Sequence, residues 1–310
     1  MKTLREAIND YLMMRRDLGF ELYHVERDLG SFASFLEGEK ASYITIDVAL
    51  RWAMQPSDAR PAYWAQRLSC VRGFARYWSA VDPRTEVPPG RLLPFPNRRA
   101  RPYIYSDEEI QRLMTAAKAL PPQDGLRRWT YYCLFGLLTV TGLRISELIS
   151  LKCCDVDLQE GLFTIRGTKF DKTRLVPLHV STRLVLRQYA QRRDAYLGRP
   201  CADKFLVSER GRPLEASIVR RTFYDLSHQT GLRGVGDRSG PRLHDFRHRW
   251  AVESLLQCYR SGENVGCLLP VLSTYLGHRN VSDTYWYLSA CPELMERAAQ
   301  RLEARWEGQS

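Results

Sequence analysis

The sequence lacks the features that mark a membrane or a secreted protein. No apolar run approaches the ~20 residues that cross a bilayer as a helix, and the stretch after Met1 has no apolar segment like that of a signal peptide. The eight cysteines include no CxxC pair, so no zinc-binding pattern is visible. We therefore expect a cytoplasmic protein with reduced thiols, without a metal and without a membrane partner.

Acidic residues are fewer than basic residues. Lys and Arg number 46 against 35 Asp and Glu, which gives a formal net charge of +11 and a pI of about 9.4. Such a surplus favours a polyanionic partner, most simply nucleic acid, although a soluble protein can also be basic without binding one. The length of 310 residues allows two domains, and a hydrophobic content of 44% is ordinary for a chain that buries a core.

Residues 1–81 are predicted to form a small helical domain. Apolar residues recur at helical spacing in four segments, of which the last two span 46–54 and about 62–79. The last helix carries three arginines that we place off its apolar stripe: Arg67, Arg72 and Arg76. A helix could press these side chains against the phosphates of a duplex. The alternative is a solvated basic face.

Residues 82–104 are predicted to form a basic linker. The segment holds six prolines and five arginines. Proline at this density prevents regular helix and sheet, so we expect an extended chain. The linker could lie across a duplex while the flanking domains close around it, or it could be only a solvated tether.

A second, larger domain is predicted over 105–290. Ser106 and Glu109 have the spacing of a capping box, and the almost wholly apolar stretch 129–140 indicates a central core helix that Gly142 ends. Runs rich in β-forming residues at 161–167 and 173–179 predict a hairpin. Further helices are expected at 181–197, 217–230, from 244 and at 292–306, with a short helix or turn at 268–276. The predicted fold class is therefore mainly α with a small β-sheet (α+β).

Three cationic side chains stand out in this domain. Arg144 lies among apolar residues, where a cation is costly without a partner or a bound anion, and Glu147 at i+3 could hold its guanidinium. His244 and Arg247 share a helical face and could reach one phosphate together. His248, at i+4 from His244, could suggest a metal pair, but no third ligand is apparent. Each of these residues also has an ordinary structural interpretation, as a salt-bridged or satisfied polar group.

The hairpin loop and the C-terminal region add further candidates. Lys169 and Lys172 share the loop, where a mobile lysine can act as a general acid or simply be solvated. His278 could donate a hydrogen bond to a phosphate oxygen or cap a turn. Tyr287, nine residues later, is either a nucleophile or an aromatic core residue, and Tyr285 lies two residues before it.

The order and spacing of these motifs resemble the tyrosine recombinases, or phage-integrase family. The resemblance covers residues 106–290 and extends more loosely to the N-terminal helices, which look like the family's core-binding domain. It is carried by TGLRISEL, GTKFDKTRLVPL, HDFRH and LGHRNVSDTYWYL, which hold Arg144, Lys169, His244, Arg247, His278 and Tyr287. The last of these motifs is more similar to integrases of transposons and other mobile elements than to chromosome-dimer resolvases.

The resemblance implies an enzyme that breaks and rejoins DNA through a 3′-phosphotyrosine, without metal or ATP. The two arginines and His278 would bind the scissile phosphate, His244 would assist proton transfer from Tyr287, and Lys169 would protonate the departing 5′-oxygen. Lys172 would be a second, non-catalytic lysine that contacts DNA, and Glu147 and Asp245 would support the catalytic side chains.

The resemblance also implies an assembly. Two domains would encircle double-stranded DNA, and four protomers would assemble on two sites, with or without sister recombinases. Residues 291–310 would form a helix that docks on a neighbour through Leu294, Ala298, Leu302 and Trp306, unless it packs on its own domain. Three rivals remain open: a type IB topoisomerase that only relaxes DNA, an inactive DNA-binding protein and, least favoured, a metal nuclease.

Overall fold

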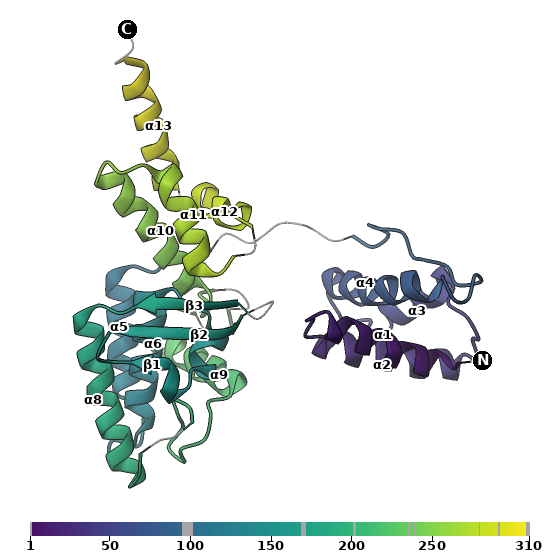
Figure 1. Cartoon of the computed structure of the whole chain (residues 1–310), viewed down its shortest axis with the longest axis horizontal. Helices are drawn as coiled ribbons and strands as arrows, with labels where there is room; N and C mark the ends of the chain where they lie inside the picture. Colours follow the sequence, from purple (N-terminus) through teal and green to yellow (C-terminus); the bar gives the residue numbers. More distant parts are fainter. Residues whose placement is uncertain are drawn as a thin grey trace. The chain divides into compact units, whose positions relative to one another are not determined.

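The chain divides into two compact units, residues 1–100 and 101–310 (Figure 1). The computed structural model describes residues 2–94, 102–168, 172–200, 203–234, 236–237, 240–278, 280–290 and 292–307. The structure is mainly helical with one small antiparallel sheet, which confirms the predicted fold class. No helix in the described part of the chain is long and apolar enough to cross a membrane.

The N-terminal unit consists of α1 (Leu4–Asp17), α2 (Tyr23–Gly38), α3 (Ile46–Met54) and α4 (Pro61–Trp78). Thr3 and Glu6 close a capping box at the start of α1, and the hydroxyl of Thr45 accepts a hydrogen bond from Val48 N–H at the start of α3. The apolar stripes of the helices meet in one core, in which Phe32 packs against Trp52 at a centroid distance of 5.1 Å.

The three arginines of α4 do not form the single exposed face that we predicted. Arg67 is buried, its guanidinium lies 3.8 Å from the centroid of Trp52, and it donates a 2.8 Å hydrogen bond to the carbonyl of Trp52. The expectation that Arg67 lies off the apolar stripe is therefore wrong. Arg72 is half-buried and donates to the carbonyls of Pro88 and Pro89. Arg76 alone of the three is exposed.

Both ends of the predicted 82–104 linker pack against a unit. On the N-terminal side, Thr85 is buried and the carboxylate of Glu86 accepts from the backbone N–H of Ile46 at 2.7 Å, which caps α3. On the C-terminal side, Tyr103 is half-buried and its ring packs against Tyr105 of the following domain, with ring centroids 5.2 Å apart. Residues 95–101 lie outside the described part of the chain.

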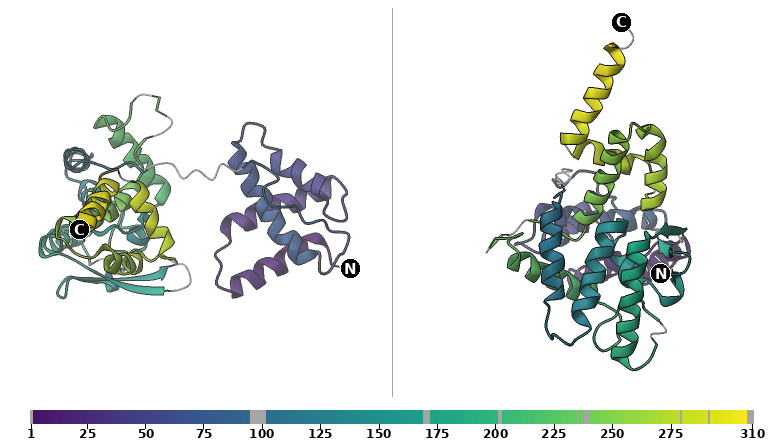
Figure 2. Two further views of the ribbon diagram at one scale, coloured as in Figure 1. Left: turned by 90° about the horizontal axis from the view of Figure 1, so that it is seen from above. Right: turned by 90° about the vertical axis from the view of Figure 1, so that its left-hand side faces the viewer.

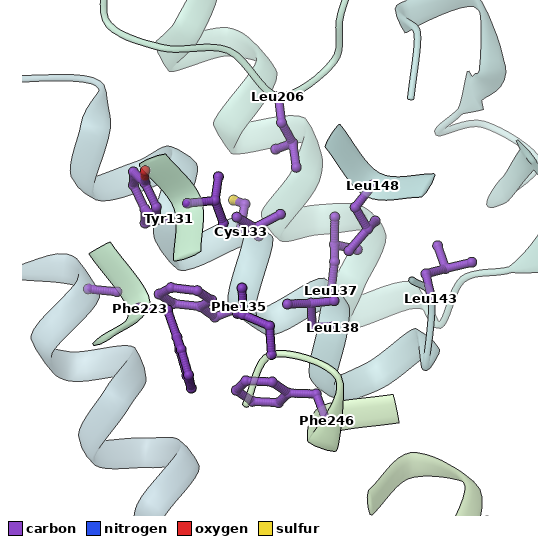
Figure 3. Packing of buried hydrophobic residues seen from close by; sticks show 14 of the residues in the cluster. Tyr131, Cys133, Phe135, Leu137, Leu138, Leu143, Leu148, Leu206, Phe223 and Phe246 are labelled. Carbon is purple, nitrogen blue, oxygen red and sulfur yellow. The ribbon is translucent and has the colours of Figure 1, made fainter. Parts of the chain in front are cut away.

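The second unit is built around α6 (Arg127–Thr141), with α5 (Asp107–Lys118), α8 (Val180–Leu197) and α9 (Ala216–Gln229) around it. Ser106 and Glu109 form the predicted capping box of α5. Phe135 of α6 packs against Phe223 and Phe246, as Figure 3 shows. Gly142 ends α6 in the left-handed region at φ 59°, where a Cβ would lie 2.7 Å from the ring of Trp250. The chain can therefore turn here and begin α7 (Ile145–Ser150) at once.

The sheet has strand order β1-β2-β3, and both pairs are antiparallel. Its strands are β1 (Val156–Asp157), β2 (Leu162–Thr168) and β3 (Lys172–Pro177). The hairpin of β2 and β3 was predicted, and the two-residue strand β1 was not. Leu162 pairs with Pro177 and Ile165 with Arg174.

The C-terminal helices form a second core within this unit. They are α10 (Asp245–Arg260), α11 (Val265–Leu276), α12 (Ser282–Ala290) and α13 (Pro292–Glu307), and α13 extends beyond the others (Figures 1 and 2). The prediction for 268–276 is wrong in extent, because α11 starts three residues earlier and continues through Pro270. A separate helix α12 around Tyr287 was not predicted.

Part of α13 packs on its own unit. Leu294 is buried in the C-terminal core, Glu293 pairs with Arg260 at 3.1 Å, and Arg301 donates to the carbonyl of Glu263 at 2.8 Å. Leu294 thus packs on its own unit, which is the alternative left open in the sequence analysis, and Ala298 is half-buried. The side chains of Leu302 and Trp306 lie outside the described part of the structure.

Candidate active site

Arg144 is held at the start of α7 by two partners on opposite sides. Its Nη1 donates to Glu147 Oε1 at 2.9 Å, and its Nη2 donates to the carbonyl of Gly277 at 3.2 Å. The backbone N–H of Arg144 also donates to Glu147 Oε2 at 2.9 Å. The side chain is 35% exposed, so the fixed guanidinium still faces solvent, where an anion could bind.

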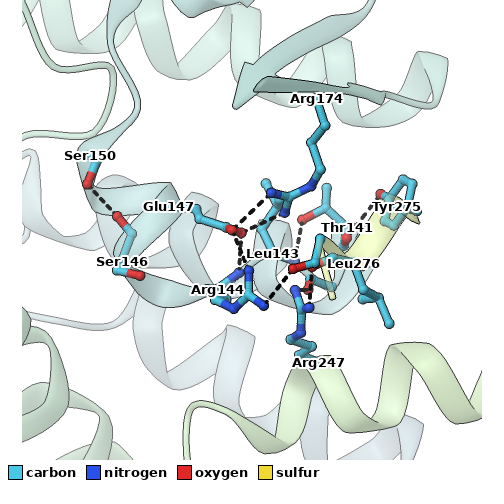
Figure 4. Close-up of polar contacts among 12 residues, drawn as sticks. Thr141, Leu143, Arg144, Ser146, Glu147, Ser150, Arg174, Arg247, Tyr275 and Leu276 are labelled. Carbon is cyan, nitrogen blue, oxygen red and sulfur yellow. Dashed lines mark hydrogen bonds and ion pairs between the residues drawn. The ribbon is translucent and has the colours of Figure 1, made fainter. Parts of the chain in front are cut away.

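A further arginine, Arg174 of β3, forms an ion pair with the same carboxylate. Its Nη1 and Nη2 donate to Glu147 Oε1 and Oε2 at 3.0 and 2.8 Å, which is a bidentate ion pair between two nearly buried side chains. Figure 4 shows Glu147 between Arg144 and Arg174. Burial alone would raise the pKa of Glu147, but the hydrogen bonds and charges of Arg174 and Arg144 outweigh it, and the net shift is downward. Glu147 is therefore an anion at neutral pH.

Arg247 reaches the site from α10. It is 1% exposed, its Nη1 donates to the carbonyl of Gly142 at 3.0 Å, and its Nη2 donates to the carbonyl of Leu276. Burial and the nearby charge of Arg144 lower its pKa to about 10, so it remains protonated at pH 7. The two backbone carbonyls belong to the turn after α6 and to the end of α11, so Arg247 ties both segments to the site (Figure 4).

His278 is directed by the turn that ends α11. Gly277 adopts φ 64°, and a Cβ there would lie 3.1 Å from Nη1 of Arg174, so a larger residue would press on the arginine pair. The ring Nδ1 of His278 lies 2.8 Å from Thr284 Oγ1 of α12, and Thr284 is fully buried. This contact connects the turn to the helix that carries Tyr287.

Tyr287 packs against residues of the same site, within one chain. It is 2% exposed, and its ring is stacked on His278 at a centroid distance of 6.0 Å and tilted against His248 at 5.4 Å. Tyr285 is 53% exposed and belongs to a different face of α12. Of the two tyrosines, Tyr287 is therefore the one packed among the histidines and beside the charge of Arg247.

The histidines of the site are neutral at pH 7. Burial and the charge of Arg247 lower the pKa of His244 to about 4, although this ring is in contact with solvent. The same two causes lower the pKa of His278 to about 4. Burial, with the proximity of His244, lowers the pKa of His248 to about 3. The positive charge of the pocket is thus carried by guanidinium groups, and the imidazoles can donate or accept protons as neutral groups.

The buried His248 makes stability depend on pH. Its pKa of about 3 in the folded state lies below the usual 6.5, so the unfolded chain binds a proton first as the pH falls. We expect stability to decrease from pH 6.5 downward, by about 2 kcal/mol between pH 7 and pH 5 from this group alone. Chemical unfolding at the two pH values measures the loss. His248→Phe, which keeps a ring but cannot titrate, should reduce it, and an unchanged pH dependence in this variant would contradict the assignment.

The other predicted site residues are Asp245, Lys169 and Lys172. Asp245 is 1% exposed, and its carboxylate binds the guanidinium of Arg242 at 2.8 Å and the backbone N–H of the same residue, so it fixes the chain before α10. Lys169 lies outside the described residues, and for Lys172 only its position at the start of β3 is described. Among the described residues, no group of three His, Cys, Asp or Glu side chains could hold a metal ion.

Sequence reasoning missed Arg174. A signal was present, because Arg174 and Val176 are two residues apart on β3 and therefore face the same side of the sheet. Val176 is fully buried. A charged residue on the buried side of a strand calls for a buried partner.

Comparison with known proteins gives a consistent result. A model of the phage integrase family matches residues 104–293. The putative integrase/recombinase y4rB of Sinorhizobium fredii is 53% identical over an alignment of 311 residues. The alignment covers 99% of this chain and 99% of y4rB. Tyrosine recombinase XerD of Caulobacter vibrioides is 30% identical over 241 residues, or 77% of this chain and 74% of XerD. The integrase of transposon Tn1549, solved in complex with transposon right end DNA, shares the fold with a TM-score of 0.69 at 15% identity, over 98% of this chain and 99% of that one.

The mainly helical domain with its cluster of arginines and buried tyrosine is thus that of a DNA-recombining enzyme of the tyrosine type. The chain belongs to the phage integrase family.

Proposed function

We propose that Tyr287 attacks a phosphodiester of double-stranded DNA and forms a 3′-phosphotyrosine. The observation that supports this most is the position of Tyr287, which is packed against His278 and His248 of its own chain and beside the guanidinium of Arg247. A phenol is a poor nucleophile at its usual pKa of about 10, so such an attack requires cations at the phosphate and a proton acceptor nearby.

The guanidinium groups of Arg144 and Arg247 stabilise the phosphate as charge develops on it. Both are fixed by backbone carbonyls before DNA binds, so little reorganisation accompanies the reaction. His278 adds a hydrogen-bond donor through the ring nitrogen that does not face Thr284. Glu147 and Asp245 support this arrangement, Glu147 by orienting Arg144 and Asp245 by fixing the start of α10.

The step balances without a cofactor. The Tyr287 oxygen forms a bond to phosphorus, the bond from phosphorus to the 5′-oxygen breaks, and the phenolic proton passes to His244, which is neutral at pH 7. Lys169 supplies the proton to the departing 5′-oxygen. The phosphotyrosyl bond keeps the energy of the broken phosphodiester, so a 5′-hydroxyl can attack it and rejoin the strand without ATP.

The DNA is the end of a mobile element, and four protomers assemble on two such sites. The Tn1549 integrase, whose fold this chain shares, was solved with transposon right end DNA, and a lambda integrase of the same fold was solved as a tetramer on a Holliday junction. The C-terminal part of α13 beyond Leu294 would contact a neighbouring protomer. Residues 1–81 would bind the duplex opposite the catalytic domain, with the basic linker between the two.

Within α4, we expect Arg76 rather than Arg67 to contact phosphates. Arg76→Ala should weaken DNA binding and reduce the slope of log affinity against log salt by about 1, without changing the melting temperature. Arg67→Ala should lower the melting temperature instead, because it removes a buried cation stacked on Trp52. Gel-shift titrations at several salt concentrations, together with thermal melting, separate the two effects. A large salt-slope change in a stable Arg67 variant would contradict this assignment.

The proposed chemistry is tested by trapping the covalent complex. The full chain is incubated in excess EDTA with DNA that spans the ends of its element, the reaction is stopped with detergent, and the bound strands are sequenced. We expect protein on 3′-ends at discrete positions. Two mapped sites are then placed on one plasmid: strand exchange supports recombination, and relaxation alone would support the topoisomerase alternative. No adduct in EDTA, with cleavage when Mg²⁺ is present, would overturn the proposal.

A further inference from the structure

We propose that Arg174 is a positioning residue that neutralises Glu147 and so keeps the charge of Arg144 available to the scissile phosphate. This inference rests on the proposed function, because it concerns the same phosphate. Nothing in the sequence motifs assigned a role to Arg174, and its contacts show no direct path to the DNA: the side chain is 10% exposed and both of its Nη atoms are bound to Glu147.

Glu147 accepts four hydrogen bonds. Two come from Arg174 and two from the backbone and side chain of Arg144. The hydrogen bonds from Arg144 fix the direction of its guanidinium. A lone carboxylate in this position, however, would also cancel the positive charge that it orients, because opposite charges at 2.9 Å in a partly buried site compensate each other strongly.

Arg174 neutralises Glu147, so that Glu147 can orient Arg144 without cancelling its positive charge. Within the described residues, Glu147 is the only carboxylate that hydrogen-bonds Arg144, Arg174 or Arg247. Three guanidinium groups and one carboxylate leave a net charge of +2, since the histidines are neutral. A phosphodiester carries one negative charge and a pentacoordinate phosphorane carries two. The site is therefore balanced for the transition state rather than for the bound substrate, and this balance requires Arg174.

The geometry also gives Arg174 a place in the framework of the site. It projects from β3, and a Cβ placed on Gly277, whose carbonyl is the second partner of Arg144, would lie 3.1 Å from its Nη1. The same guanidinium thus lies between the carboxylate that orients Arg144 and the turn before His278.

The inference is tested with variants that change the net charge of the site and keep the size of the side chains. Arg174→Met keeps the aliphatic volume and removes the cation, while Glu147→Gln can still accept a hydrogen bond from Arg144 but carries no charge. Arg174→Met combined with Glu147→Gln therefore restores the net charge of +2. The full-length variants are compared on a nicked duplex with the cleavage site mapped for the wild type, by single-turnover adduct formation and by gel-shift affinity.

We expect Arg174→Met to slow adduct formation by about 10- to 100-fold, less than the ~10²- to 10³-fold loss when a direct oxyanion donor is removed, with affinity nearly unchanged. Arg174→Lys should retain more activity than Arg174→Met, and the double variant should return to within about 10-fold of the wild type. On a duplex with a methylphosphonate at the cleavage site, where the phosphate is neutral, the defect of Arg174→Met should largely disappear.

An equal defect on both duplexes, or a double variant as slow as Arg144→Met, would overturn the inference and leave Arg174 a purely structural residue. The double variant leaves no buried carboxylate at position 147 without its arginine partner, so this comparison also holds if Arg174→Met does not fold. If the wild type forms no adduct, the proposed function fails and this inference with it. If the wild type does form one and charge restoration has no effect, only the inference fails.

Discussion

Replacing Tyr287 by Phe is expected to reduce covalent protein–DNA adducts to background while DNA binding persists. The expected loss is on the order of 10⁶-fold, the scale seen when an enzyme with a covalent intermediate loses its nucleophile. Phenylalanine keeps the ring that packs against His278 and His248, so only the hydroxyl is removed. Adduct formation on the mapped site, measured with gel-shift affinity for the same DNA, provides the test.

Tyr285→Phe is the matched control, because the two tyrosines lie on the same helix two residues apart. Tyr285 is 53% exposed, against 2% for Tyr287. The hydroxyl of Tyr285 can therefore be removed without disturbing the packing of the site. We expect adducts at the wild-type level in this variant. Adducts that survive in Tyr287→Phe but disappear in Tyr285→Phe would show that the wrong tyrosine was chosen.

Local sequence signals predicted the helical framework well. The capping box at Ser106 and the helix end at Gly142 depend on residues within three or four positions of one another, so their pattern is visible in the sequence. The extent of α11 was missed for a local reason as well. A proline inside a helix removes one backbone hydrogen bond, but Pro270 lies six residues from the cap at Asn264, and packing of the helix in the C-terminal core outweighs the lost bond.

Arg67 was misassigned because its partner is remote in the sequence. Its position on α4 is at the edge of the apolar stripe, and a charged residue at such an edge is usually solvated. In the structure, Trp52 of α3 offers both a ring face and a backbone carbonyl to the guanidinium. Nothing in the spacing of α4 indicates which side of α3 it meets.

In the site, too, local motifs were predictable and contacts between remote segments were not. The residue types at Arg144, His244, Arg247, His278 and Tyr287 were predicted from motifs, and four segments of the chain bring them together. The way they are held was not predictable, since it depends on carbonyls of Gly142, Leu276 and Gly277 at helix ends. Arg174 was missed for this reason, because its contact with Glu147 joins a strand to a helix start 27 residues earlier.

Arg247→Met is expected to impair both cleavage and stability. The loss of a guanidinium at the phosphate should slow adduct formation by about 10²- to 10³-fold. The same change leaves the carbonyls of Gly142 and Leu276 without their donors in a buried site, which should cost about 1–3 kcal/mol for each unsatisfied group. Single-turnover adduct formation and chemical unfolding of the same preparation measure the two effects.

Arg249→Met separates these two effects, because Arg249 lies two residues further along α10 and has a similar structural role. Its Nε donates to the carbonyl of Tyr105 at 2.8 Å and its Nη2 to Asp107 at 2.5 Å, on the side of the helix that faces α5. We expect this variant to lose stability but to form adducts at nearly the wild-type rate at a temperature where both proteins are folded. Equal cleavage defects in the two variants would mean that Arg247 acts only by holding the turn and the end of α11, and that the phosphate is bound elsewhere.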